Sequence, residues 1–235
     1  MTEPRDAAEE AAAVSPVFTP DDEPYRGRAA LFRFDQVLVV LAAEQSRIGL
    51  WTRTHELTAL QRAAGELVPG ACSVSFGVRE LVRQGYLLAA MILIRPLVER
   101  VSTLAYLIDH EDAVSLWQAG WPHGSRPGLA TRLKTIGGPG NPADTDIQQS
   151  LDELRQTYNS LIHGDPQSAL TSAVLLSDGA VGYTISKDLT SPARADDICR
   201  QASAYAMVLT VRCAEIFPAK LDNETLQNWA FSSRT

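Results

Sequence analysis

A nearly uninterrupted apolar segment at residues 86–108, YLLAAMILIRPLVERVSTLAYLI, constrains the fold of this chain more than any other feature. It is long enough to span a bilayer as a helix. Three charged residues, Arg95, Glu99 and Arg100, lie near its middle, where lipid makes charge costly. We therefore expect no membrane span, but a helix that is buried within a bundle of other helices.

Further helical patterns precede and extend this segment. We expect one helical region over about 29–67, a break at VPGACS (68–73), and a second helical region over about 73–108. The second region is interrupted at three positions, Gly77, Gly85 and Pro96. Such interruptions predict a kink or a division of the helix.

The second half of the chain combines short helices, turns and one pair of strands. We expect short helices near 111–121 and 129–136, and a longer helix that starts at Asp144 or Thr145 and ends near Ile162. Alternating apolar residues around Asp178-Gly179 predict a β-hairpin near 172–186. Ser191-Pro192 then marks the start of a last long helix.

These patterns together predict an all-α fold, a helical bundle over residues 29–217 with one small β-hairpin insertion. Residues 1–28 mix acids, alanines and prolines without periodicity, so we expect them to form a mobile acidic tail. Residues 218–235 are interpreted as a C-terminal tail.

Charge and cysteine content limit the partners and the compartment. The formal charge of −7 disfavours contact with free nucleic acid or anionic lipid except through a local basic patch. Three widely spaced cysteines and an N-terminus without an apolar segment predict a cytoplasmic protein. Ligand-spaced histidines and cysteines are missing from the sequence, so we expect no metal site and no cofactor.

Polar residues form a stripe on each of two predicted helices. Arg95, Glu99, Ser102 and Tyr106 fall on one face of the apolar helix, where Arg95 and Glu99 are spaced to pair. Arg155, Asn159 and His163 form the second stripe, at i, i+4 and i+8. Either each stripe faces water, or the two stripes face each other and bring Arg95 and Glu99 close to His163. His163 followed by Gly164 is equally typical of a plain helix end, because both residues suit a C-terminus.

The segment YNSLIHGD (158–165) resembles the signature helix of the HEPN superfamily of small α-helical proteins, with Asn159, His163 and Gly164 at the Asn, His and Gly positions of the motif. The combination of IRPLVERVSTLAYLI and SLIHGD also resembles a group of uncharacterised bacterial proteins. These pair an Arg-x-x-x-Glu helix with a Ser-x-x-His helix end, here Arg95, Glu99, Ser160 and His163.

The resemblance to the HEPN superfamily implies a homodimer that acts as a metal-independent endoribonuclease of a toxin or phage-defence type. His163 would act as acid or base, Asn159 and Ser160 would orient the phosphate, and Arg95 with Glu99 would complete the catalytic set. Tyr158 stands where the motif has its arginine, so Arg95 or Arg155 would have to bind the phosphate instead. The alternative is a catalytically silent HEPN-like bundle that binds a protein partner or a nucleotide.

Overall fold

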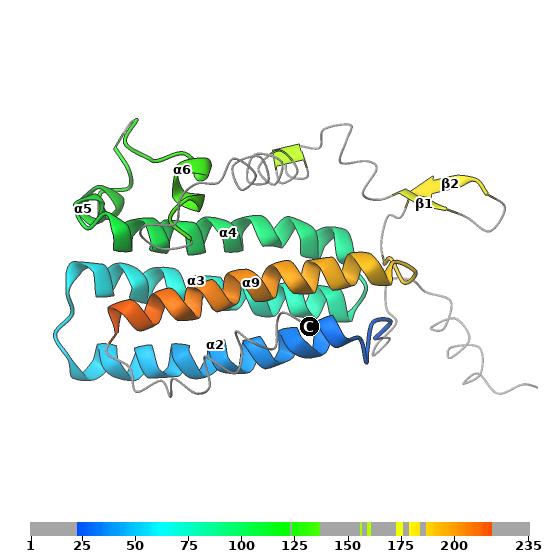
Figure 1. Cartoon of the computed structure of the whole chain (residues 1–235), viewed down its shortest axis with the longest axis horizontal. Coiled ribbons are helices and arrows are strands. Elements are labelled where there is room, and N and C mark those ends of the chain that lie inside the picture. Colours follow the sequence, from blue (N-terminus) through cyan, green and yellow to red (C-terminus); the bar gives the residue numbers. More distant parts are fainter. Residues whose placement is uncertain are drawn as a thin grey trace, which may run out of the picture.

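The computed structural model describes residues 23–122, 124–136, 156, 159–160, 173–175, 179–183 and 187–217. Four long helices lie side by side in this part of the chain (Figure 1). They are α2 (Ala29–Thr54), α3 (Ala59–Arg83), α4 (Leu87–Asp109) and α9 (Pro192–Ile216). Two short helices, α5 (Ala113–Gln118) and α6 (Leu129–Leu133), follow α4 and lie on its side of the bundle. The predicted all-α class is thus confirmed.

The apolar segment at residues 86–108 forms α4, which packs against α3, α9 and α6. Eleven of its residues are buried, among them Leu97, Leu104 and Leu107 with no exposed surface. This extent of burial explains the almost continuous apolar sequence. Among the described helices, none combines the length and the apolar character needed to cross a membrane.

The predicted break at residues 68–73 is wrong, because α3 runs through it with Pro69 inside the helix. Pro69 is exposed, whereas its neighbours Val68, Ala71 and Cys72 are buried. Burial of that face stabilises the helix enough to offset the backbone hydrogen bond that proline removes. The actual break lies between Thr54 and Ala59.

The start of α3 is fixed by a reciprocal capping box. The Thr58 hydroxyl accepts a hydrogen bond from the Gln61 backbone N–H, and the Gln61 side chain accepts one from the Thr58 N–H. Thr-x-x-Gln before an apolar segment is a known signal for the start of a helix. The sequence therefore indicates the start of α3 at Ala59, although the break was predicted at 68–73.

The predicted division of the second helical region occurs at Gly85, between α3 and α4. Gly85 has a φ of +82°, and a Cβ at this position would lie 2.9 Å from Leu189 Cδ2. Its carbonyl accepts a hydrogen bond from the Asp188 N–H at 2.8 Å.

The residues before α2 also contact this region. The Tyr25 hydroxyl, in a residue that is only 2 % exposed, donates a hydrogen bond to the Asp188 carbonyl. The tail predicted over residues 1–28 is therefore too long, because Tyr25 belongs to the core of the bundle.

The last helix, α9, begins at Pro192 after Ser191, as predicted. Short strands β1 (Ala173–Leu175) and β2 (Val181–Tyr183) pair antiparallel, with Val174 opposite Gly182. They lie within the segment for which a hairpin was predicted. The chain that joins them at 176–178, most of the predicted 144–162 helix and the 218–235 tail lie outside the described residues.

Candidate functional site

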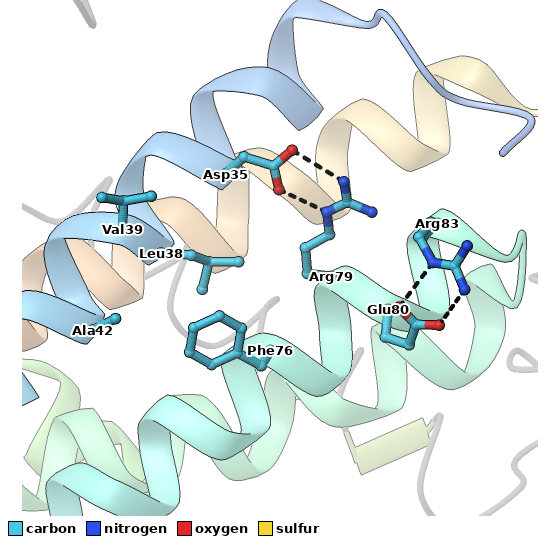
Figure 2. Close-up of a pocket in the computed structure, with 8 residues that line it drawn as sticks. All are labelled: Asp35, Leu38, Val39, Ala42, Phe76, Arg79, Glu80 and Arg83. Carbon is cyan, nitrogen blue, oxygen red and sulfur yellow. Dashed lines mark hydrogen bonds and ion pairs between the residues drawn. The ribbon is translucent and has the colours of Figure 1, made fainter.

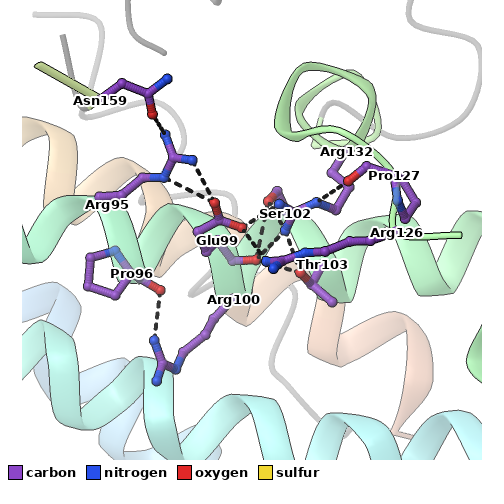
Figure 3. A network of polar contacts seen from close by, with 10 residues as sticks. All are labelled: Arg95, Pro96, Glu99, Arg100, Ser102, Thr103, Arg126, Pro127, Arg132 and Asn159. Carbon is purple, nitrogen blue, oxygen red and sulfur yellow. Dashed lines mark hydrogen bonds and ion pairs between the residues drawn. The ribbon is translucent and has the colours of Figure 1, made fainter. Parts of the chain in front are cut away.

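The polar stripe of α4 forms a defined ion pair. Arg95 Nε donates to Glu99 Oε1 at 3.0 Å, and Arg95 Nη2 lies 2.8 Å from the same oxygen (Figure 3). The i, i+4 spacing places both side chains on one side of the helix, and both are mostly buried, with 16 % and 22 % of the side chains exposed. The pairing predicted from the sequence is thus present.

Arg95 also contacts the second polar stripe. Its Nη1 donates to Asn159 Oδ1 at 3.2 Å, across 64 positions of sequence. Figure 3 shows Asn159 reaching Arg95 from the side opposite Glu99. The structure therefore brings Arg95, Glu99 and Asn159 together. Two other predicted site residues, Arg155 and His163, lie outside the described residues, as does Tyr158.

Ser160, the neighbour of Asn159, is 7 % exposed, and its Oγ has no hydrogen-bond partner within the part of the chain that the structure describes. A buried hydroxyl without a partner costs free energy, because it has lost its hydration without gaining a bond. Ser102, the next member of the α4 stripe, is instead fully buried and donates to the Glu99 carbonyl at 3.3 Å.

Glu99 is the centre of a larger cluster than the sequence predicted. Its Oε2 accepts a hydrogen bond from Arg132 and lies 3.2 Å from Arg126 Nη2. Both arginines come from the loop and short helix that follow α5, and Figure 3 shows their side chains directed toward Glu99. We call Arg95, Glu99, Arg126 and Arg132 the arginine cluster.

Arg132 connects this loop to α4 through hydrogen bonds. Its Nη1 donates to the Thr103 hydroxyl at 2.7 Å and to the Glu99 carbonyl at 3.1 Å, and its Nε donates to the Pro127 carbonyl at 3.3 Å. Only 3 % of the side chain is exposed. Sequence reasoning missed Arg132, although its position offered a signal: together with Leu129 and Leu133 it occupies the apolar face of α6.

The cluster carries an excess of positive charge. Three guanidinium groups surround one carboxylate, which leaves two positive charges on a chain whose formal charge is −7. Burial raises the pKa of the Glu99 carboxyl, but the hydrogen bond from Arg132 and the charges of Arg132 and Arg95 outweigh burial and hold that pKa below its ordinary value. Burial lowers the pKa of Arg132, although a guanidinium stays protonated in proteins. Glu99 is therefore an anion at neutral pH.

Arg126 is the accessible member of the arginine cluster. Its side chain is 60 % exposed, against 16 % for Arg95 and 3 % for Arg132. A guanidinium with this exposure can bind a phosphate without first losing a buried partner. The arrangement is therefore a partly open cationic site, with Asn159 at one end and Arg126 at the other.

A hollow of about 530 Å³ lies elsewhere, between α2 and α3 (Figure 2). Its charged groups are balanced: Arg79 pairs with Asp35, and Arg83 pairs with Glu80, each at 2.6 Å. No positive charge is left in excess there for a phosphate. Within the described part of the chain, no group of three or more His, Cys, Asp or Glu side chains is placed to hold a metal ion.

Comparisons of the chain with protein-family models, with curated proteins and with solved structures give no match.

Proposed function

We propose that this chain is a HEPN-like, metal-independent endoribonuclease in which the arginine cluster binds an RNA phosphate and His163 transfers the proton. The observation that carries the proposal is the hydrogen bond from Arg95 to Asn159. It connects the Arg-x-x-x-Glu helix to the segment in which Asn159 precedes His163 by four residues. The helix with the Arg-x-x-x-Glu pattern and the segment that resembles the HEPN motif are thus in contact through Arg95 and Asn159.

The proposed reaction requires only groups of this chain. His163 as a base removes the proton of a ribose 2′-hydroxyl, whose oxygen attacks the neighbouring phosphorus. The bond from phosphorus to the 5′-oxygen breaks, and that oxygen takes up a proton from an imidazolium. The products are a 2′,3′-cyclic phosphate and a 5′-hydroxyl. Guanidinium groups stabilise the additional negative charge on the phosphate oxygens in the transition state.

In this proposal Arg95 replaces the arginine that the family has at the position of Tyr158. Glu99 holds the Arg95 guanidinium in place through Nε and Nη2, and Asn159 accepts from Nη1. The Ser160 hydroxyl, which has no hydrogen-bond partner among the described residues, would bind a phosphate oxygen. Arg155 stays a second candidate for phosphate binding. The HEPN-like arrangement of the bundle with its hairpin, the homodimer, and the cytoplasmic toxin or phage-defence role belong to the same proposal.

The test is cleavage of single-stranded RNA by the pure protein in EDTA, compared with His163→Ala and Arg95→Ala. The matched control is His55→Ala, which removes an exposed histidine at the end of α2, outside the arginine cluster. We expect both site variants to lose activity by at least about a hundredfold, the scale of general acid–base and electrostatic contributions. We expect His55→Ala to cut at the wild-type rate. Equal activity of His163→Ala and wild type, with both folded by circular dichroism, would reject the proposal.

A second candidate function is a catalytically silent bundle that binds a second protein chain. The exposed apolar side chains around the hollow between α2 and α3 favour it, since Val39 is 70 % and Phe76 is 47 % exposed. Sedimentation of the wild type beside Val39→Glu tests whether this surface joins two copies of the chain. A wild-type dimer that the substitution dissociates, together with an absence of RNA cleavage, would favour this function over the first.

A further inference from the structure

An aromatic cluster lies beyond the arginine cluster at the end of α4. Tyr106 and His110 are stacked, with ring centroids 4.1 Å apart and planes inclined by 9°. Trp121 approaches Tyr106 edge to face, with centroids 6.5 Å apart. Tyr106 and Trp121 are half-buried and His110 is exposed. We call these three residues the aromatic platform.

The platform and the arginine cluster share one face of α4. Tyr106 follows Glu99 by seven residues, which is two turns, or about 10 Å along the axis. Trp121 and Arg126 both belong to the loop between α5 and α6, so a second connection of only a few residues joins the same two groups. The arginine cluster and the aromatic platform are therefore neighbours both along α4 and along the loop that contains Arg126.

Trp121 occupies a backbone conformation that side chains rarely adopt. Its φ is +56°, the one positive φ among the described residues other than glycine. Its N–H donates to the Leu116 carbonyl at 2.9 Å, which closes the end of α5. A bulky residue in this region is strained, and such strain is concentrated at functional positions. Packing against the small core of Ala63, Leu107, Ala113 and Val114 holds the ring in place.

We propose that the aromatic platform binds the bases of single-stranded RNA whose backbone passes through the arginine cluster. This inference rests on the proposed function and adds the form of its substrate. Bases stack on aromatic rings only where they are not already paired and stacked in a duplex. Exposed Arg126 attracts the phosphates next to the stacked base. The exposed carboxylates of Glu111 and Asp112, which follow His110 at the other end of the aromatic platform, repel phosphates. The strand therefore extends from the platform toward Arg126.

Binding can be measured without cleavage. A fluorescently labelled, short 2′-O-methyl oligouridine lacks the attacking hydroxyl, so its anisotropy reports binding to the wild-type protein in EDTA. We expect the same strand in a duplex with its complement to bind at least about tenfold more weakly. Trp121→Leu should also weaken binding of the single strand about tenfold, the loss expected for one stacked base, and Trp121→Phe should restore it.

The matched control is Trp51→Leu. Trp51 is also half-buried and also stacks on a histidine, His55, at 3.6 Å, but it belongs to α2. Its substitution should leave the affinity unchanged. Arg126→Gln should lower the slope of log affinity against log salt by about one, as loss of one phosphate contact does.

The outcomes separate this inference from the proposed function. Equal affinity for single strand and duplex, or a folded Trp121→Leu variant that binds as wild type does, overturns the aromatic platform even where RNA is cleaved through His163. Loss of binding in Trp121→Leu with retention in Trp51→Leu supports the platform even where no RNA is cleaved. A wild type that neither binds nor cleaves overturns both.

Discussion

The substitution Glu99→Gln tests the centre of the arginine cluster. It removes one negative charge and keeps the size of the side chain, so Arg132 loses its only charged partner among the described residues while its guanidinium stays buried. Removal of one partner from a buried ion pair costs about 3–5 kcal/mol. The bonds from Arg132 to Thr103 and to the Glu99 carbonyl remain, so we expect the lower end, about 3 kcal/mol.

Urea denaturation followed by circular dichroism measures this loss. In thermal denaturation of a domain of this size, a loss of about 3 kcal/mol corresponds to a fall in Tm of about 6–12 °C. The slope of unfolding free energy against urea should stay unchanged if the folded state is otherwise intact. The double variant Glu99→Gln with Arg132→Met should recover much of the lost stability, because it leaves no unpaired buried charge.

The control for this experiment is Glu80→Gln. Glu80 also pairs with an arginine, Arg83, but 51 % of its side chain is exposed. Water screens such a pair, so we expect a far smaller change than for Glu99→Gln. Equal costs for the two substitutions, or a cost below about 1 kcal/mol for Glu99→Gln, would show that Glu99 is not a buried partner of Arg132.

The pH dependence gives an independent check with a defined sign. The pKa of Glu99 is lower in the folded protein than its ordinary value of 4.5. Its contribution is therefore complete above that ordinary value and is lost as the pH falls through the lower, folded-state pKa. We expect the difference in unfolding free energy between wild type and Glu99→Gln to narrow in acid. A difference that is constant from neutral pH to below pH 4 would contradict this.

Three further predictions concern the bundle. Thr58→Ala should cost about 1 kcal/mol in chemical denaturation, since it breaks the capping box with Gln61; an unchanged midpoint would show that the cap is dispensable. Gly85→Ala should cost about 1–2 kcal/mol, because φ is +82° there; the same denaturation assay would contradict the conformational argument if stability rose. Burial raises the pKa of Cys72 to about 11 and of Cys199 to about 12, so both thiols should resist alkylation at pH 8 until the protein is unfolded, and rapid labelling of the folded protein would refute this.

Local patterns predicted much of the bundle. The course of α4, the start of α9 at Pro192 and the Arg95–Glu99 pair all depend on neighbours within a few positions, which periodicity and helix spacing describe well. The prediction of a break at 68–73 was wrong because it ignored contacts between helices. Burial of the face that contains Val68 and Ala71 is a tertiary effect, and it outweighed the local preference of Pro69.

The candidate site was predicted only in part for the same physical reason. The contact of Arg95 with Asn159 could be anticipated because each residue belongs to a polar stripe on an apolar helix. Arg126 and Arg132 reach Glu99 across 27 and 33 positions from a loop-rich stretch, where no periodicity indicates the direction of a side chain. Arg132 occupies the apolar face of α6, which is a signal that the residue is buried. The local sequence of Arg126 contains no feature that distinguishes it from a solvated arginine.

The most direct test of the central claim is an analysis of the RNA ends that the wild-type protein produces in EDTA. Attack by the 2′-hydroxyl predicts products with a 2′,3′-cyclic phosphate and a 5′-hydroxyl, and no cleavage of the 2′-O-methyl strand. We expect the wild type to form these ends without metal and His163→Ala not to form them. An absence of cleavage, or cleavage that requires added Mg²⁺ and leaves a 5′-phosphate, would contradict it.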